Sequence, residues 1–446
     1  MKQWLNELRR LSALSIPVVL SQLGVMLLFV VDSMMVGHYD VDALAAAYLG
    51  GTCIGSTRMF GMGVVFGIEP LVSQAHGARD ARKAGDALQQ GLIVALIVSV
   101  PTIALWCFTE EFLLLAGQSS ELARAAESYV LIQAPAVPVF YAVMALRGYL
   151  QCRGIMYPIT TIIFTANVLN VFLNWVLIFG NLGAPQLGLN GAALATCCVE
   201  VFTLIVLAVW IVRGELYKGG WAGWRRDAIA PKRLANVFRL GVPIGLQIGL
   251  EGWAFQISTL GAGLLGTTEL ASHSIVLNLA SLSFMVPLGM SIATATRVGN
   301  HIGAEKLIDA QRAAWTALSL GGAVMICSAS VFIIGREVLP LFYTTDTAVV
   351  SLAASIFPIA AAFQLFDGVQ VVGSGILRGM GRTRPAAAFN LLGYYVLALP
   401  LGWMIATKLG AGLAGIWWGL CIGLGVVATM LVLWIGYRGP TRAFGV

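Results

Sequence analysis

The sequence predicts an all-α integral membrane protein in which twelve transmembrane helices form two pseudo-symmetric six-helix bundles. Composition, long apolar runs and an internal repeat support this prediction. Of the 446 residues, 58% are hydrophobic and 11% are charged, whereas a soluble protein has about 25% charged residues. Soluble domains of this length and disordered chains are therefore excluded. Seven cysteines are also too few for a secreted disulfide scaffold.

Twelve apolar runs are each long enough to cross a bilayer, which takes about 20 residues. The runs lack the alternation of a strand, and in lipid a helix pairs every backbone group within its own segment. The first run is too long for a signal peptide and lacks a small-residue cleavage site, so we interpret it as the first helix. The expected helices cover residues 11–37, 47–72, 88–112, 126–148, 159–182, 188–213, 238–263, 272–298, 313–335, 351–373, 386–410 and 413–437.

The basic residues predict the orientation of these helices. With a cytoplasmic N-terminus, 23 of the 27 Lys and Arg residues fall on the cytoplasmic side, three fall outside, and Arg58 lies within a span. This bias predicts that both termini are cytoplasmic. The formal charge of +6 therefore follows from topology. It does not indicate nucleic-acid binding, because the basic residues are spread over separate loops.

The two halves of the chain resemble each other. Ile16-Pro17 matches Val242-Pro243, and Gly77-Ala78 matches Gly303-Ala304, both at an offset of 226 residues. An even number of spans in each repeat keeps both repeats in the same orientation, which is typical of transporters with two parallel bundles. The expected organisation is an N-terminal six-helix bundle (1–213), a basic cytoplasmic linker (214–237) and a C-terminal six-helix bundle (238–446).

Apart from charges close to the ends of the runs, about seven charged residues in the apolar runs call for an explanation. A charge at the centre of a helix costs about 2.5–3.5 kcal/mol, so each one needs a reason. Glu69 and Glu127 are near run ends and are expected to be interfacial. Glu200 is deeper, and a function and a buried structural hydrogen bond are both open. We expect Arg58 to neutralise one of the remaining acids and to line the substrate site, with a purely structural partner as the alternative. Those acids are Asp32, Glu251 and Asp367.

Asp32, Glu251 and Asp367 are the strongest functional candidates. They do not recur in both halves, because the repeat places Ser258 opposite Asp32 and Val25 opposite Glu251. Carboxylates in a low-dielectric cavity can exchange protons near neutral pH. Two carboxylates, here Glu251 and Asp367, can also form an oxygen site for a hard cation such as Na⁺. The alternative is that each acid is fixed in a helix–helix hydrogen bond.

Two aromatic residues share a helical face with these acids. Phe255 is four residues after Glu251, and Phe363 is four residues before Asp367. A carboxylate beside a ring can bind a large organic cation, so both rings are candidates for lining a substrate site. The alternative is that the rings simply face lipid or the core.

A polar face in the first half is predicted to point inward. Asn170 and Asn174 are four residues apart on one expected helix, and Thr196 is on the next. Neutral amides in lipid are costly unless they are paired, so we expect this face to point toward Asp32, with Thr196 lining the substrate site. The alternative is simple hydrogen bonding between helices.

Four features together resemble the MATE (multidrug and toxic compound extrusion) transporters, in particular the bacterial NorM-like branch. They are the stretch Val31-Asp-Ser-Met-Met-Val-Gly37, the stretch Val72-Ser-Gln-Ala-His-Gly-Ala78, Glu251 and Asp367. The resemblance covers essentially the whole chain. It implies two six-helix bundles in a V shape in the bacterial inner membrane. It also implies the export of cationic or amphipathic organic compounds in exchange for Na⁺ or H⁺ by alternating access.

The same resemblance implies two ion sites. They are formed by Asp32, Asn170 and Asn174 in the first half, and by Glu251 and Asp367 in the second. Phe363 stands where some members have a Tyr, which removes one oxygen and leaves both Na⁺ and H⁺ open as the coupling ion.

Motifs for other chemistry are missing from the sequence. There is no Gly-rich nucleotide loop and no His–Glu zinc motif, and Cys197-Cys198 lacks a second pair at ligand spacing. We therefore expect no enzyme activity, no nucleotide or nucleic-acid partner and no cofactor besides the coupling ion. The expected partners are membrane lipid and small organic cations, and the expected state is a monomer.

Two other classes of function remain as alternatives. A flippase or metabolite exporter on a related scaffold would need a strongly basic cavity, for which Arg58 is the only candidate. A membrane-embedded transferase would need clustered aspartates at a membrane face, and Asp40 with Asp42 are too few. A channel is less expected than a carrier, because no ring of acids is evident.

Overall fold

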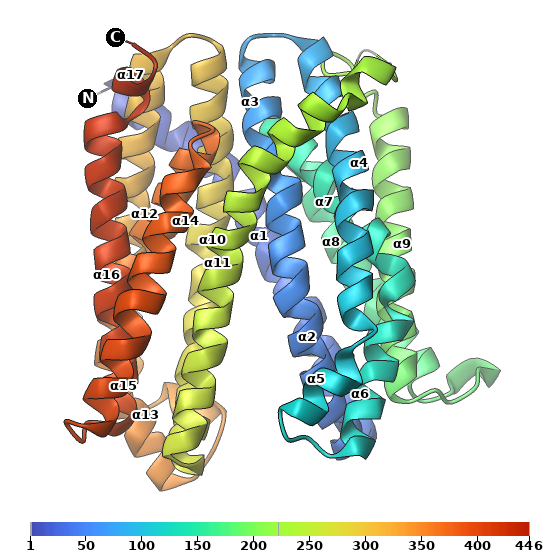
Figure 1. Ribbon diagram of the computed structural model, residues 1–446, viewed down its shortest axis with the longest axis vertical. Helices are drawn as coiled ribbons and strands as arrows, with labels where there is room; N and C mark the ends of the chain where they lie inside the picture. Colours follow the sequence, from blue (N-terminus) through green and yellow to red (C-terminus); the bar gives the residue numbers. More distant parts are fainter. Residues whose placement is uncertain (1, 222, 446) are drawn as a thin grey trace. The chain divides into compact units, whose positions relative to one another are not determined.

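The computed structural model describes residues 2–221 and 223–445, and every regular element in these ranges is a helix (Figure 1). The first part contains α1 (Lys2–Tyr39), α2 (Val41–Val65), η1 (Phe66–Ile68), α3 (Glu69–Gly77), α4 (Ala81–Trp106), α5 (Thr109–Leu115), α6 (Ser120–Ile132), η2 (Ala134–Ala136), α7 (Val137–Cys152), α8 (Tyr157–Leu177), η3 (Asn181–Gly183), α9 (Leu189–Arg213) and η4 (Arg226–Ile229). The second part contains α10 (Pro231–Leu265), α11 (Thr267–Gly303), α12 (Leu307–Gly335), η5 (Leu339–Phe342), α13 (Thr347–Gly379), α14 (Thr383–Asn390), η6 (Leu391–Ala398), α15 (Leu399–Thr407), α16 (Gly412–Arg438) and α17 (Pro440–Ala443).

Ten helices in the described part of the chain are long and apolar enough to cross a membrane, judged by length and composition. The two further spans expected from the sequence, 47–72 and 238–263, lie mainly in α2 and α10. Both helices carry a charged residue within the expected span, Arg58 in α2 and Glu251 in α10. The all-α membrane fold predicted from the sequence is confirmed.

Prolines interrupt two of the expected spans. Pro135 and Pro138 have no N–H to donate, and between them the chain passes from α6 through the short 3₁₀ helix η2 into α7. In the eleventh span, Pro400 cannot donate to the carbonyl four residues earlier. The preceding segment η6 is wound as a π-helix, in which bonds join residues five apart.

The described chain packs into two compact units. The N unit is Leu20–Gly245, and the C unit is Met1–Val19 together with Leu246–Val446. The two bundles expected at 1–213 and 238–446 are defined by the internal sequence repeat, and this division stays a prediction. The compact units are defined by which residues pack together. They differ from the predicted bundles because the start of α1 belongs to the C unit and the start of α10 belongs to the N unit.

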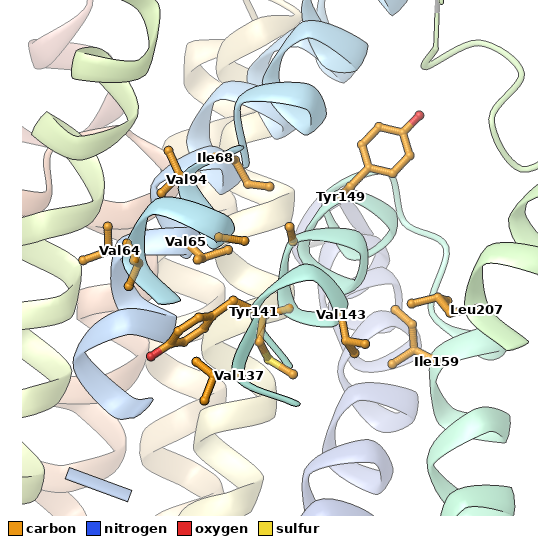
Figure 2. Packing of buried hydrophobic residues seen from close by; sticks show 14 of the residues in the cluster. Val64, Val65, Ile68, Val94, Val137, Tyr141, Val143, Tyr149, Ile159 and Leu207 are labelled. Carbon is orange, nitrogen blue, oxygen red and sulfur yellow. The ribbon is translucent and has the colours of Figure 1, made fainter. Parts of the chain in front are cut away.

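The N unit is built around one large apolar cluster. Val64 and Val65 of α2 lie in it together with Val137 and Tyr141 of α7 (Figure 2). Tyr141 is fully buried, and its hydroxyl lies 3.1 Å from the hydroxyl of Thr102 on α4. The phenol is therefore satisfied, and the ring can fill the core without leaving a polar atom unpaired.

The C unit is organised around α13, which packs against α11, α12 and α16. Glycines allow the closest of these approaches. A Cβ atom added at Gly375 would lie 2.5 Å from the carbonyl oxygen of Ser291, and one at Gly379 would lie 2.5 Å from that of Ala295. Small residues of this kind let two helix backbones touch. The helix that carries Asp367 is thus held by neighbours on several sides.

The first turns of α1 pack within the C unit. Leu11 is fully buried in an apolar cluster with residues of α11, α12 and α13. The carboxylate of Glu7 accepts two hydrogen bonds from Arg297 of α11, at 2.7 and 2.8 Å. Figure 1 shows the start of α1 and α17 at the same end of this unit.

The first turns of α10 pack within the N unit. Val237 belongs to the apolar cluster of that unit. Arg233 donates to Asp86 of α4 at 2.7 Å. A Cβ atom added at Gly241 would lie 2.0 Å from the carbonyl oxygen of Val64, so α10 and α2 touch at the backbone. Both α1 and α10 therefore begin in one unit and end in the other.

Candidate functional site

Asp32 is the centre of a polar site in the N unit. Asn170 and Asn174 of α8 donate to its Oδ1 atom at 2.9 and 2.6 Å, and Thr196 of α9 donates to its Oδ2 atom at 3.3 Å. The two asparagines are almost completely buried. Two helices thus bring three neutral donors to a single carboxylate on a third helix.

The local sequence explains this geometry. Residues four apart on a helix share a face, so Asn170 and Asn174 lie one above the other, 3.3 Å apart between Nδ2 and Oδ1. Hydrogen bonds from donors to a carboxylate are stronger than those between neutral groups and hold it in place. The predicted juxtaposition of Asn170, Asn174 and Thr196 with Asp32 is present. The role in ion coupling assigned to this set stays a prediction.

Arg58 lies elsewhere in the N unit and pairs with Glu200. Its Nη1 atom donates to Oε1 of Glu200 at 2.8 Å, and its guanidinium lies over the rings of Phe140 and Trp106, 4.6 and 5.3 Å from their centres. The prediction that Arg58 neutralises Asp32, Glu251 or Asp367 is wrong. The arginine pairs instead with the acid on α9, one of several helices that α2 contacts. Its predicted place beside the substrate stays untested.

Glu251 of α10 forms a second polar site in the C unit. Gln370 of α13 donates to its Oε2 atom at 3.0 Å, and Asn390 of α14 donates to the same atom at 3.3 Å. Asn390 also donates to the backbone oxygen of Gln247 at 3.2 Å. Sequence reasoning missed both amides. Gln370 could have been found, because it is three residues from Asp367 on one helix, whereas Asn390 had no partner at helical spacing.

Asp367 lies in the same unit, within range of electrostatic interaction with Glu251. It is 4% exposed, and among the described residues its Oδ1 atom has no hydrogen-bond partner. Arg378 is within electrostatic range of Glu251. Two buried carboxylates repel each other, and a bound cation or proton relieves this repulsion.

The donor set in the C unit suits a hard monovalent cation. Glu251 and Asp367 supply carboxylate oxygens, and the Oε1 atom of Gln370 is buried without a partner in the described chain. Oxygen ligands of this kind favour hard cations over transition metals. Consistently, the described residues contain no group of three or more His, Cys, Asp and Glu that could hold a metal ion.

The predicted aromatic residues meet in the C unit. The rings of Phe255 and Phe363 are 6.0 Å apart, edge to face, and Phe255 contacts Tyr394 with the same spacing. Phe363 also contacts Trp417 at 5.8 Å. Phe363 is only 2% exposed, so its faces are covered by protein. The substrate-lining role of Phe255 and Phe363 stays a prediction.

One cavity of about 280 Å³ in the C unit lies apart from these side chains. It is lined mostly by apolar groups of α10, α15 and α16, among them Leu260, Trp403 and Ile416. None of the predicted site residues lines it.

Comparison with known proteins gives consistent results. The MatE family model matches residues 17–176 and 243–404. A probable multidrug resistance protein NorM from Bradyrhizobium diazoefficiens is 36% identical over 94% of this chain and 91% of its own length. Multidrug and toxin extrusion protein 1 of Xenopus tropicalis is 34% identical over 94% of this chain and 72% of its own length. The crystal structure of the eukaryotic MATE transporter AtDTX14 matches 97% of this chain and 96% of that one, with 25% identity and a TM-score of 0.90.

Proposed function

Because this chain belongs to the MATE family of transporters, we propose that it exports cationic and amphipathic organic compounds by secondary active antiport. The coupling ion is Na⁺ or H⁺, and the carrier works by alternating access. The transport cycle needs no catalytic step and no nucleotide. The chain acts as a monomer in the bacterial inner membrane, with both termini in the cytoplasm, as the distribution of basic residues predicts.

The observation that carries this proposal is the presence of two partly buried carboxylate sites on long apolar helices. Asp32 has three neutral donors in the N unit, and Glu251 has two in the C unit. Acidic side chains within membrane-spanning helices are rare, and they mark ion and substrate pathways. An ion moving into a negative cytoplasm releases about 2.3 kcal/mol per charge for each 100 mV of membrane potential.

In this proposal the acids alternate between two positive partners. Glu251 and Asp367 hold the coupling cation or proton when the carrier is open to the outside. An organic cation competes for the same negative charge when the carrier is open to the cytoplasm, and neutralisation of the acids releases it outward. Asp32 acts in the same way in the N unit, where its amide partners fix the orientation of the carboxylate.

Transport of a fluorescent organic cation into inverted membrane vesicles tests the proposal. A Na⁺ gradient alone and a pH gradient alone are imposed in turn, and one of them is expected to drive uptake. Asp367→Asn is expected to abolish it at equal expression. Glu337→Gln is the matched control, because its side chain is 76% exposed in the same unit. Unchanged transport in Asp367→Asn, or no transport with either gradient, contradicts the proposal.

The flippase alternative receives less support from the geometry. It requires a strongly basic cavity, and its single candidate residue, Arg58, is already neutralised by Glu200.

A further inference from the structure

The hydroxyl of Tyr394 is buried without a partner. Tyr394 lies in the π-helical segment η6, and its side chain is 0% exposed. Across residues 2–221 and 223–445, no group forms a hydrogen bond with its Oη atom. Buried polar atoms of native proteins are nearly always paired, so an unpaired phenol in a membrane protein calls for a ligand.

Tyr394 packs against Phe255, which shares a helix with Glu251. Its ring packs edge to face against Phe255 at 6.0 Å, and Phe255 is one helical turn after Glu251. Tyr394 is within electrostatic range of both Glu251 and Asp367, yet it forms a hydrogen bond with neither. The Oδ1 atom of Asp367 is also unpartnered and buried.

Two contacts fix the segment that carries Tyr394 against α10. Asn390, directly before η6, donates to Glu251 and to the backbone of Gln247. Tyr395, the next residue, donates its hydroxyl to the backbone oxygen of Leu250 at 3.2 Å. The π-helical winding therefore gives two adjacent tyrosines different roles. Tyr395 is satisfied by a backbone carbonyl, and Tyr394 is left with a free oxygen near two acids.

We propose that the phenol oxygen of Tyr394 is a ligand of the coupling cation, together with the carboxylates of Glu251 and Asp367. This inference rests on the proposed function. A hard cation prefers oxygen ligands. A cation that contacts two oxygens also holds them further apart than a direct hydrogen bond does, which fits carboxylate and phenol groups that are near but unbonded. Phe363 offers no oxygen here, and Tyr394 supplies a neutral one from another helix.

Equilibrium binding of ²²Na⁺ to the purified full-length protein, with no drug present, tests this inference. Tyr394→Phe keeps the ring and removes only the oxygen. It is expected to weaken Na⁺ binding at least about tenfold, which is the scale for loss of a supporting group at a metal site. Tyr395→Phe is the matched control and is expected to leave Na⁺ affinity unchanged within about twofold. Equal melting temperatures for both variants and the parent protein show that the fold is preserved.

Equal ²²Na⁺ affinity in Tyr394→Phe and the parent protein overturns the inference, and so does the absence of Na⁺ binding by the parent protein. The second outcome separates the inference from the proposed function. If a pH gradient drives efflux while Na⁺ does not bind, the function stands and the ligand role of Tyr394 fails. If Na⁺ binding depends on Tyr394 but no gradient drives efflux, the ligand role stands and the function fails.

Discussion

Asn174 donates a 2.6 Å hydrogen bond to the Oδ1 atom of Asp32, although 142 residues separate them in the sequence. The partners of Asp32 are two amides and a hydroxyl, whereas Glu251 of the C unit has, besides two amides, a second carboxylate, Asp367, within electrostatic range. The two sites are built from similar parts but differ in charge. With all three carboxylates ionised, one monovalent cation would balance the charge of Asp32 and would leave one negative charge at the pair in the C unit.

Asn174→Ala is expected to uncouple transport. The substitution removes the donor to Asp32 and leaves the carboxylate less well oriented, so ion-driven efflux falls at equal expression. Asn167→Ala is the matched control, because Asn167 is a buried amide on the same helix that donates to the backbone of Gly24 and Ile163. Both variants are expected to lose about 1–3 kcal/mol of stability. Efflux that falls equally in both contradicts a specific role for Asn174.

The pair of Arg58 and Glu200 is expected to show strong coupling in a double-mutant cycle. Arg58→Met or Glu200→Leu alone leaves an uncompensated buried charge and is expected to cost about 3–5 kcal/mol of unfolding free energy. The double variant is expected to recover most of that loss, because apolar groups then replace the whole pair. Thermal unfolding in detergent measures the effect. Additive losses in the double variant argue against the ion pair.

The contact of Gly241 with Val64 predicts a sharp difference between two glycine variants. In Gly241→Ala the new Cβ atom would lie 2.0 Å from the carbonyl oxygen of Val64, so α10 must move and stability is expected to fall by about 1–3 kcal/mol. Gly55→Ala is the control, because a Cβ atom there has no neighbour within 4 Å. It is expected to be neutral or stabilising by up to about 1 kcal/mol. Equal melting temperatures for the two variants would disprove the contact.

Asp80 predicts a pH-dependent contribution to stability outside the membrane. It caps α4 by accepting from the backbone N–H of Lys83 at 2.9 Å, and this bond holds the pKa of Asp80 below its usual value. The folded state thus favours the charged form. The contribution is present above the ordinary pKa and is lost as the pH falls through the lowered one.

Asp80→Ala is therefore expected to cost about 0.5–2 kcal/mol at pH 7. The difference from the parent protein is expected to shrink toward pH 3. Thermal melts at a series of pH values measure it, and Asp80→Asn is the control because it keeps a capping oxygen without the charge. A difference that grows on acidification contradicts the capping role.

Much of the fold is predictable because lipid restricts the choices. An apolar run in a bilayer is favoured as a helix, and each expected span lies mainly in helical segments, although some spans cover more than one element and ten of the described helices are long and apolar enough to cross a membrane. The sequence could not show that the eleventh span contains the π-helical segment η6. Pro400 lies in that span, but its effect on the preceding turn depends on packing against neighbouring helices.

The candidate site was predictable only where its residues lie on one helix at a spacing that places them on the same face. Asn170 and Asn174 share a face by spacing alone, so their approach to Asp32 could be anticipated. Arg58 was assigned the wrong partner, because spacing along a helix does not say which helix lies opposite. Tyr394 escaped notice for a related reason, since π-helical winding changes which residues share a face.

The exchange of α1 and α10 between the two compact units has a consequence for biosynthesis. During translation the first turns of α1 are synthesised before the helices that they pack against. Leu11 packs against α11, α12 and α13, and Glu7 accepts hydrogen bonds from Arg297 of α11. The N unit, in turn, is incomplete until the first turns of α10, which belong to it, have been synthesised. The N unit is a single segment and is complete once the chain has been made as far as Gly245, whereas the first turns of α1 have to wait for α11, α12 and α13 before the C unit can pack around them.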